Sequence, residues 1–118
     1  MKVGLIISTY NWIDALDQVL NSVKHQTRLP DEVIVCDDGS NKDTKNFVLS
    51  LQQYFPSILK YVWQEDKGFR AAAIRNKGIN ELSTNIDYVV VIDGDMLLHN
   101  KFIQDHIGCA EKNYFIQG

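Results

Sequence analysis

The chain has 118 residues, of which 45% are hydrophobic and 23% are charged, and its formal net charge is −3. This balance predicts one soluble globular domain over residues 1–118, and it argues against a disordered or fibrous chain and against nucleic acid as a partner. The N-terminal apolar run is too short for a signal peptide, and no stretch is as long as a membrane-spanning helix. The two cysteines, Cys36 and Cys109, do not suggest a disulfide framework, and Cys36 lies in an apolar run that predicts a core position. A reducing compartment fits these cysteines best, so we expect a cytoplasmic protein.

Apolar runs that predict strands alternate with helical patterns along the chain. Strands are predicted at 3–8, 32–36, 58–63 and 88–92, with a further one beginning at 114. Helices are predicted at 12–23, 40–51, 68–77 and from 100 onwards. Asn11 and Ser40 are expected to cap the first two helices, and Gly78 is expected to close the third. This order predicts an α/β fold with a mostly parallel sheet.

Polar residues gather where three of these strands end. In the usual strand order 3-2-1-4, the first and fourth strands are neighbours at the point where the order reverses, and ligands of open α/β sheets bind there. The segments concerned are Ser8-Thr9-Tyr10-Asn11, Asp37-Asp38-Gly39-Ser40 and Asp93-Gly94-Asp95. The sequence therefore predicts a ligand crevice lined by carboxylates, hydroxyls and an aromatic ring.

The chain has no glycine-rich loop of the kinds that hold a diphosphate with backbone amides. A bound diphosphate would need another positive partner. Asp93 and Asp95 are candidates to supply it by holding a divalent cation, since carboxylate oxygens suit Mn²⁺ or Mg²⁺.

Four segments together resemble the ordered signature blocks of family 2 glycosyltransferases. They are ISTYN at 7–11, VCDDGS at 35–40, GFRAAAIRNKG at 68–78 and IDGD at 92–95. The resemblance implies the GT-A fold, a Rossmann-like three-layer α/β/α sandwich. It also implies transfer of a sugar from a nucleoside diphosphate sugar, with a UDP-sugar favoured, to a glycan, polysaccharide or lipid-linked acceptor.

The resemblance also implies roles for individual residues. Thr9, Tyr10 and Asn11 would line the nucleotide pocket, with the Tyr10 ring against the base. Asp38 would accept a hydrogen bond from a uracil-type imide, and Asp37 would support the turn. Asp95 would be the main metal ligand, and Asp93 would lie near the ribose and the metal. Arg75 would also border the nucleotide. The residues implied at the diphosphate and donor sugar are Lys67, Arg70, Asn76 and Gly94.

Structural explanations compete with these roles. Asn11 and Ser40 fit helix caps, and Asp37 and Asp38 before a glycine fit a turn. The segment 93–95 fits a solvated turn, and Arg75 with Lys77 fits the end of a helix, where cations complement the dipole.

Two other functional classes stay open at this point. The first is a haloacid-dehalogenase-like phosphohydrolase, although its nucleophile motif follows a first strand and the similar segment here follows the fourth. The second is a receiver-like or nucleotide-binding module, although its acidic pair also follows a first strand, which here ends in Thr9-Tyr10-Asn11.

The acceptor side has no candidate residues. In the family, the general base of inverting members lies further beyond the acidic pair than this chain extends. We therefore expect the fold to be truncated on its C-terminal side and the chain to bind a UDP-sugar without efficient transfer. Homodimer formation through an open sheet edge is a further expectation, as is peripheral association with the inner face of the membrane through the missing region.

Overall fold

The computed structural model describes residues 2–65, 71–109 and 115–117. Strands and helices alternate along it, as the apolar pattern predicts. The strands are β1 (Val3–Thr9), β2 (Glu32–Asp37), β3 (Ile58–Trp63), β4 (Tyr88–Asp93) and β5 (Phe115–Gln117). The helices are α1 (Ile13–Lys24), α2 (Lys42–Leu51), α3 (Ala71–Asn80) and α4 (Phe102–Cys109). No helix in the described part of the chain is both long enough and apolar enough to cross a membrane.

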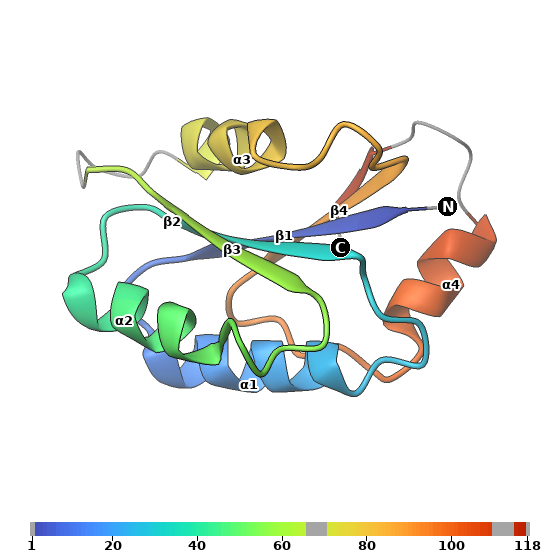
Figure 1. Cartoon of the computed structure of the whole chain (residues 1–118), viewed down its shortest axis with the longest axis horizontal. Helices are drawn as coiled ribbons and strands as arrows, with labels where there is room; N and C mark the ends of the chain where they lie inside the picture. The colour runs from blue at the N-terminus through green and yellow to red at the C-terminus, as the bar shows by residue number, and fades with distance from the viewer. Residues whose placement is uncertain (1, 66–70, 110–114, 118) are drawn as a thin grey trace.

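The strands form a parallel sheet in the order β3-β2-β1-β4-β5. The predicted neighbourhood of the first and fourth strands is therefore confirmed. Ser8 of β1 lies opposite Asp93 of β4, and Thr9 lies opposite Asp37 of β2. This register aligns the carboxyl ends of the three strands at one edge of the sheet, on the left of Figure 1.

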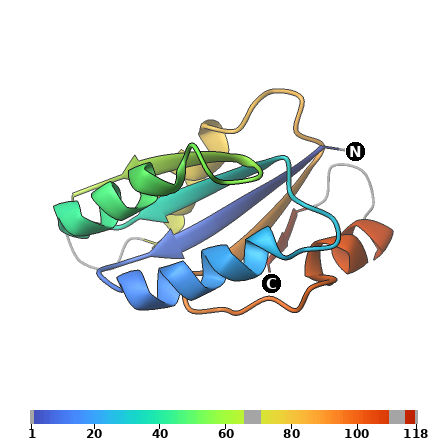
Figure 2. The ribbon, with the colours of Figure 1, turned by 60° about the horizontal axis from the view of Figure 1, so that its bottom comes forward.

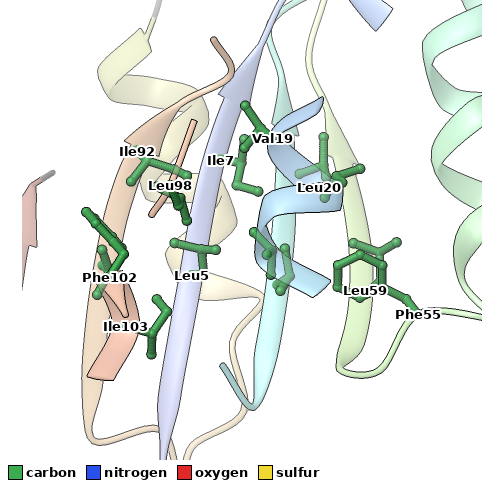
Figure 3. Close-up of a cluster of buried hydrophobic side chains, with 14 of the residues drawn as sticks. Leu5, Ile7, Val19, Leu20, Phe55, Leu59, Ile92, Leu98, Phe102 and Ile103 are labelled. Atoms are coloured by element: carbon green, nitrogen blue, oxygen red, sulfur yellow. The ribbon is translucent and has the colours of Figure 1, made fainter. Parts of the chain in front are cut away.

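Helices cover both faces of the sheet. Helix α3 lies on one face and α1, α2 and α4 lie on the other, which both ribbon views show (Figures 1 and 2). Successive residues of β1 point to opposite faces, so Leu5 and Ile7 pack with α1 and α4 while Ile6 packs with Ile74 of α3. Figure 3 shows the larger of these two cores. The predicted three-layer α/β/α sandwich is thus confirmed.

Apolar periodicity predicted most of the inward helix positions. Leu16, Val19, Leu20 and Val23 of α1 are buried, as expected, and so are Phe102 and Ile103 of α4. Trp12 is an exception, because it precedes the helix and is 57% exposed.

Both predicted N-caps are wrong. The N-cap of α1 is Trp12, which makes no side-chain cap hydrogen bond, and Asn11 instead takes the left-handed conformation with φ 45°. Asparagine tolerates that conformation better than most residues, because its short polar side chain bonds locally. The N-cap of α2 is Asn41, whose side chain accepts a hydrogen bond from the Asp43 N–H, rather than Ser40. Asn11 and Ser40 bond to the opposite loop instead.

Gly78 does not close the third helix as predicted, because α3 continues to Asn80. A Cβ atom at Gly78 would lie 2.2 Å from the Cys36 Sγ atom. The glycine therefore lets α3 pack directly on β2, and its role is close approach rather than helix termination. The predicted start of this helix, at 68–70, lies outside the described residues.

Candidate functional site

The residues predicted to line the crevice lie where β1, β2 and β4 end side by side. The innermost of them is Asp37, which has no exposed surface. One oxygen of the Asp37 carboxylate accepts the Ser40 backbone N–H at 2.9 Å, and the other accepts the Tyr61 hydroxyl at 2.5 Å. A fully buried carboxylate bonded at both oxygens shapes the turn, and any contribution to ligand binding passes through that turn.

Tyr61 is a residue that the motif analysis missed. Burial raises the pKa of its phenol, and the hydrogen bond and charge of Asp37 raise it further, so the hydroxyl stays protonated and donates. The signal available in the sequence was the position of Tyr61 within the apolar run of the third strand. A tyrosine in such a run is at least partly buried, and its hydroxyl then normally requires an acceptor.

Hydrogen bonds tie the loop after β1 to the loop after β2. The Asn11 backbone N–H donates to the Ser40 hydroxyl at 2.6 Å, and the Asn11 side-chain oxygen accepts the Asn41 N–H at 2.9 Å. Next to them, the Asp38 N–H donates to the Thr9 carbonyl at 3.1 Å. These reciprocal bonds hold Asn11 in its left-handed conformation and so position the adjoining Tyr10.

Tyr10 and Asp38 lie on opposite loops of this linked pair. Tyr10 is 51% exposed, whereas Thr9 and Asp38 are almost buried, at 8% and 9%. The Gln64 side chain donates to one Asp38 carboxylate oxygen at 2.7 Å and so orients it. An exposed aromatic ring and an oriented acceptor on two linked loops suit a flat, hydrogen-bonding ligand such as a nucleobase.

Asp93 and Arg75 meet on the β4 side of the crevice. One oxygen of Asp93 accepts the Ser8 hydroxyl at 3.2 Å and pairs with an Arg75 Nη atom at 3.2 Å. The Arg75 Nε atom is buried and has no hydrogen-bond partner among the described residues. A buried N–H without a partner is uncommon, and this one lies on the guanidinium that pairs with Asp93.

Gly94 allows the backbone to turn close to β1. A Cβ atom there would lie 2.4 Å from the Ser8 carbonyl oxygen, so a side chain would push the two strand ends apart. Asp95 follows on the exposed side of this turn, and Asn76 is exposed on α3. The predicted phosphate-side residues Lys67 and Arg70 lie outside the described residues.

The acidic pair fits a cation that takes few ligands from the protein. Asp93 and Asp95 are both exposed, and no group of three or more metal-binding side chains occurs within residues 2–65, 71–109 and 115–117. Mg²⁺ is commonly held by one or two carboxylates together with phosphates and water, and carboxylate sites suit Mn²⁺ as well. The donor set is therefore suited to a metal that arrives with a phosphorylated ligand.

Comparison with known families decides the classification of this fold and site. The model of the family described as "Glycosyl transferase family 2" matches residues 5–118. The chain belongs to glycosyl transferase family 2. This membership sets aside the phosphohydrolase and receiver-like alternatives.

Relatives within family 2 are much longer proteins. The chain is 35% identical over 104 residues to validoxylamine A glucosyltransferase of Streptomyces hygroscopicus subsp. limoneus, covering 86% of this chain and 22% of that protein. It is 33% identical over 107 residues to chondroitin synthase of Pasteurella multocida, covering 89% of this chain and 11% of that protein. The chain thus spans less than a quarter of the length of either relative.

Solved structures share the family 2 fold seen here. A structure of S. aureus TarS residues 1–349 in complex with UDP has a TM-score of 0.77 and 25% identity, over 92% of this chain and 31% of that one. A complex of the same protein with UDP-GlcNAc matches equally well, over 92% of this chain and 30% of that one.

Proposed function

We propose that this chain binds the nucleotide-sugar donor of a glycosyltransferase, with a UDP-sugar as the donor. The observation that carries the proposal is the convergence of Tyr10, Asp38 and Asp93 from three strand ends on one edge of the sheet. The similarity to a TarS structure that holds UDP supports the choice of nucleotide.

The base is bound by Tyr10 and Asp38 in this proposal. The exposed Tyr10 ring offers a face on which a uracil ring stacks. Asp38, oriented by Gln64, accepts the imide N–H that uracil carries and cytosine lacks. Thr9, Asn11 and Asp37 act through the two linked loops that position these side chains.

The diphosphate lies on the β4 side. Asp95 and Asp93 would hold Mn²⁺ or Mg²⁺ there, and the cation, when bound, would supply positive charge that stabilises the departing nucleoside diphosphate. Arg75 orients Asp93 through their ion pair and adds positive charge beside the proposed diphosphate position. Lys67, Arg70, Asn76 and Gly94 complete the proposed diphosphate and donor-sugar side.

Transfer to a glycan, polysaccharide or lipid-linked acceptor is proposed for the whole protein. The part of that step proposed for this chain is binding of the donor. A cytoplasmic location, at the inner face of the membrane, and homodimer formation belong to the same proposal.

Calorimetric titration of UDP tests this function. We expect binding in Mn²⁺, and we expect removal of the metal with a chelator or Asp95→Ala to weaken binding about tenfold or more, because each removes charge neutralisation of the diphosphate. Asp17→Ala, which removes an exposed acid on α1, serves as the matched control and should bind like the wild type. Equal UDP affinity in all four measurements would refute the metal's role, and absence of UDP binding to the wild type would refute the donor site.

A further inference from the structure

A concave surface is formed by residues of α2, of β3 and of the loop before α2. It is a groove of about 550 Å³, and we call it the α2–β3 groove. Its lining residues are Ser40, Asn41, Lys42, Lys45, Tyr61 and Trp63. None of the residues proposed above to bind the base or the metal lines it, although Ser40, Asn41 and Tyr61 also bond to Asn11 and Asp37 in the neighbouring loops.

Two aromatic rings form one wall of the α2–β3 groove. Tyr61 and Trp63 are two residues apart on β3, so their side chains leave the same face of the strand. The Trp63 Nε1–H donates to the Ser40 carbonyl at 3.0 Å, while the Tyr61 hydroxyl donates to Asp37. The polar atom of each ring is therefore engaged with the protein. Trp63 nevertheless remains 44% exposed and offers a fixed apolar surface to a ligand.

Two lysines of α2 also line the groove. Lys42 is the first residue of α2 and Lys45 lies one turn later, and both are exposed. The positive end of the helix dipole disfavours cations at these positions. Within the part of the chain that the structure describes, neither lysine forms an ion pair. Asp43 is the acid nearest in sequence, but it does not line the groove.

We propose that the α2–β3 groove binds an anionic saccharide. A sugar ring has apolar C–H faces, which suit the exposed surface of Trp63, and a rim of hydroxyls, which suits the exposed side-chain amide of Asn41. A carboxylate or phosphate on the sugar pairs with Lys42 and Lys45 and relieves their unfavourable position at the helix start. The chain's net charge of −3 opposes a long polyanion such as nucleic acid, whereas a short saccharide meets chiefly these two cations. This site goes beyond the proposed donor binding and does not depend on it.

The indole N–H resonances of the chain provide a built-in test. The sequence has two tryptophans: Trp63 lies in the α2–β3 groove, and Trp12 follows Tyr10 and Asn11 at the donor side. We expect tetragalacturonate to shift the Trp63 resonance in a two-dimensional NMR spectrum, and UDP with Mg²⁺ to shift that of Trp12. Maltotetraose, a neutral saccharide, should bind more weakly than tetragalacturonate. Tetraglutamate and tetrathymidylate, which are anions without a matching sugar rim, should not bind.

Surface variants test the lysines without disturbing the fold. Replacing both lysines, as Lys42→Gln with Lys45→Gln, should weaken tetragalacturonate binding about fivefold to tenfold, the effect of losing two partly exposed ion pairs. The matched control, Lys24→Gln with Lys101→Gln, removes two exposed lysines elsewhere and should bind like the wild type. Well-dispersed spectra of both variants establish that they are folded.

Several outcomes would overturn the proposal. They are an unmoved Trp63 resonance, an equal response to tetraglutamate or tetrathymidylate, unchanged affinity in the Lys42 and Lys45 variant, and displacement of tetragalacturonate by UDP. A Trp63 shift that follows protein concentration alone would instead assign the groove to a second copy of the chain. A failure of UDP to bind would count against the donor site and leave this proposal standing.

Discussion

Asp37 and Asp38 are adjacent in the sequence, yet their carboxylates have different partners. Asp37 is bonded to Tyr61 and to the Ser40 N–H, whereas Asp38 accepts the side chain of Gln64 at the edge of the crevice. The first carboxylate maintains the turn, and the second is the one that we propose binds the base. Because Asp37 and not Asp38 maintains the turn, Asp38 can be replaced to test its role without changing the fold.

Asp38→Asn should change the base preference of the site. The asparagine keeps an oxygen for the Gln64 donor but presents an N–H where the carboxylate accepted one. We expect UDP binding to weaken by about 1–3 kcal/mol, the effect of a lost hydrogen bond at a buried group. Binding of CDP should hold or improve, because cytosine carries an acceptor where uracil carries the imide N–H. Calorimetry with both nucleotides measures this, and equal losses for UDP and CDP would show that Asp38 is structural.

Asp31 gives stability that depends on pH. Burial by itself raises the pKa of this carboxyl, but the hydrogen bond from the Val3 N–H and the charges of Arg28 and Lys2 outweigh burial, and the pKa lies below its usual value. A lowered pKa in the folded state stabilises the protein above the unfolded-state pKa of about 4. That contribution is lost as the pH falls through the folded-state value.

Asp31→Asn should therefore lower the free energy of unfolding by about 1–2 kcal/mol at pH 7. The difference in the free energy of unfolding between this variant and the wild type should shrink as the pH falls below about 4, because the wild-type carboxyl then becomes protonated and loses its charge. Urea unfolding at neutral and acidic pH measures both values, with Asp17→Asn as the control for loss of one exposed charge. A deficit that is the same at every pH would show that Asp31 acts only through its neutral hydrogen-bonding groups.

At the scale of whole elements, one close contact sets how near α3 lies to the sheet. Gly78 and Cys36 meet in that contact, and a Cβ on the glycine would lie 2.2 Å from the cysteine sulfur. Burial raises the pKa of the Cys36 thiol to about 12, so it stays protonated and acts as a small core side chain. The combined size of the side chains at positions 36 and 78 therefore decides which substitutions the fold tolerates there.

Gly78→Ala should destabilise the chain by about 1–3 kcal/mol, because overpacking outweighs the gain in helix propensity. Adding Cys36→Ala removes the sulfur and should recover part of that loss, so that the double variant is more stable than the sum of the single effects predicts. Gly108→Ala in α4 is the matched control: its new Cβ meets no atom within 4 Å, and the change should be neutral or stabilising. Thermal or urea unfolding measures the cycle, and strict additivity would contradict the direct contact.

At the scale of the whole molecule, ligand binding should stabilise the fold, because the donor site is assembled from strands that come together only on folding. UDP with Mn²⁺ at a hundredfold excess over its Kd contributes about 2.7 kcal/mol. For a chain of 118 residues this raises the Tm by about 10 °C. Thermal unfolding with UDP, with Mn²⁺ alone and with the Asp38→Ala variant measures the effect. A Tm that rises with Mn²⁺ alone and not further with UDP would contradict nucleotide binding.

The sequence by itself was sufficient for the fold class, the positions of the strands and their order. Apolar runs and helical spacing are local signals, and the alternation of strands with helices restricts the topology strongly. The prediction that polar residues gather at one sheet edge follows from the same information, because parallel strands end together. The family blocks added the proposed nucleotide roles of Tyr10, Asp38, Asp93 and Asp95.

Only the tertiary structure decided which atoms meet. Asn11 and Ser40 match local cap patterns, yet they bond to each other's loops across 29 residues of sequence. Asp37 meets Tyr61 across 24 residues, and Gly78 meets Cys36 on another element. The physical reason is that folding brings distant donors and acceptors close to these side chains. Asn11 and Ser40 then form hydrogen bonds with those distant groups in place of the local cap bonds. The identity of that partner depends on register and packing, which local residue patterns do not encode.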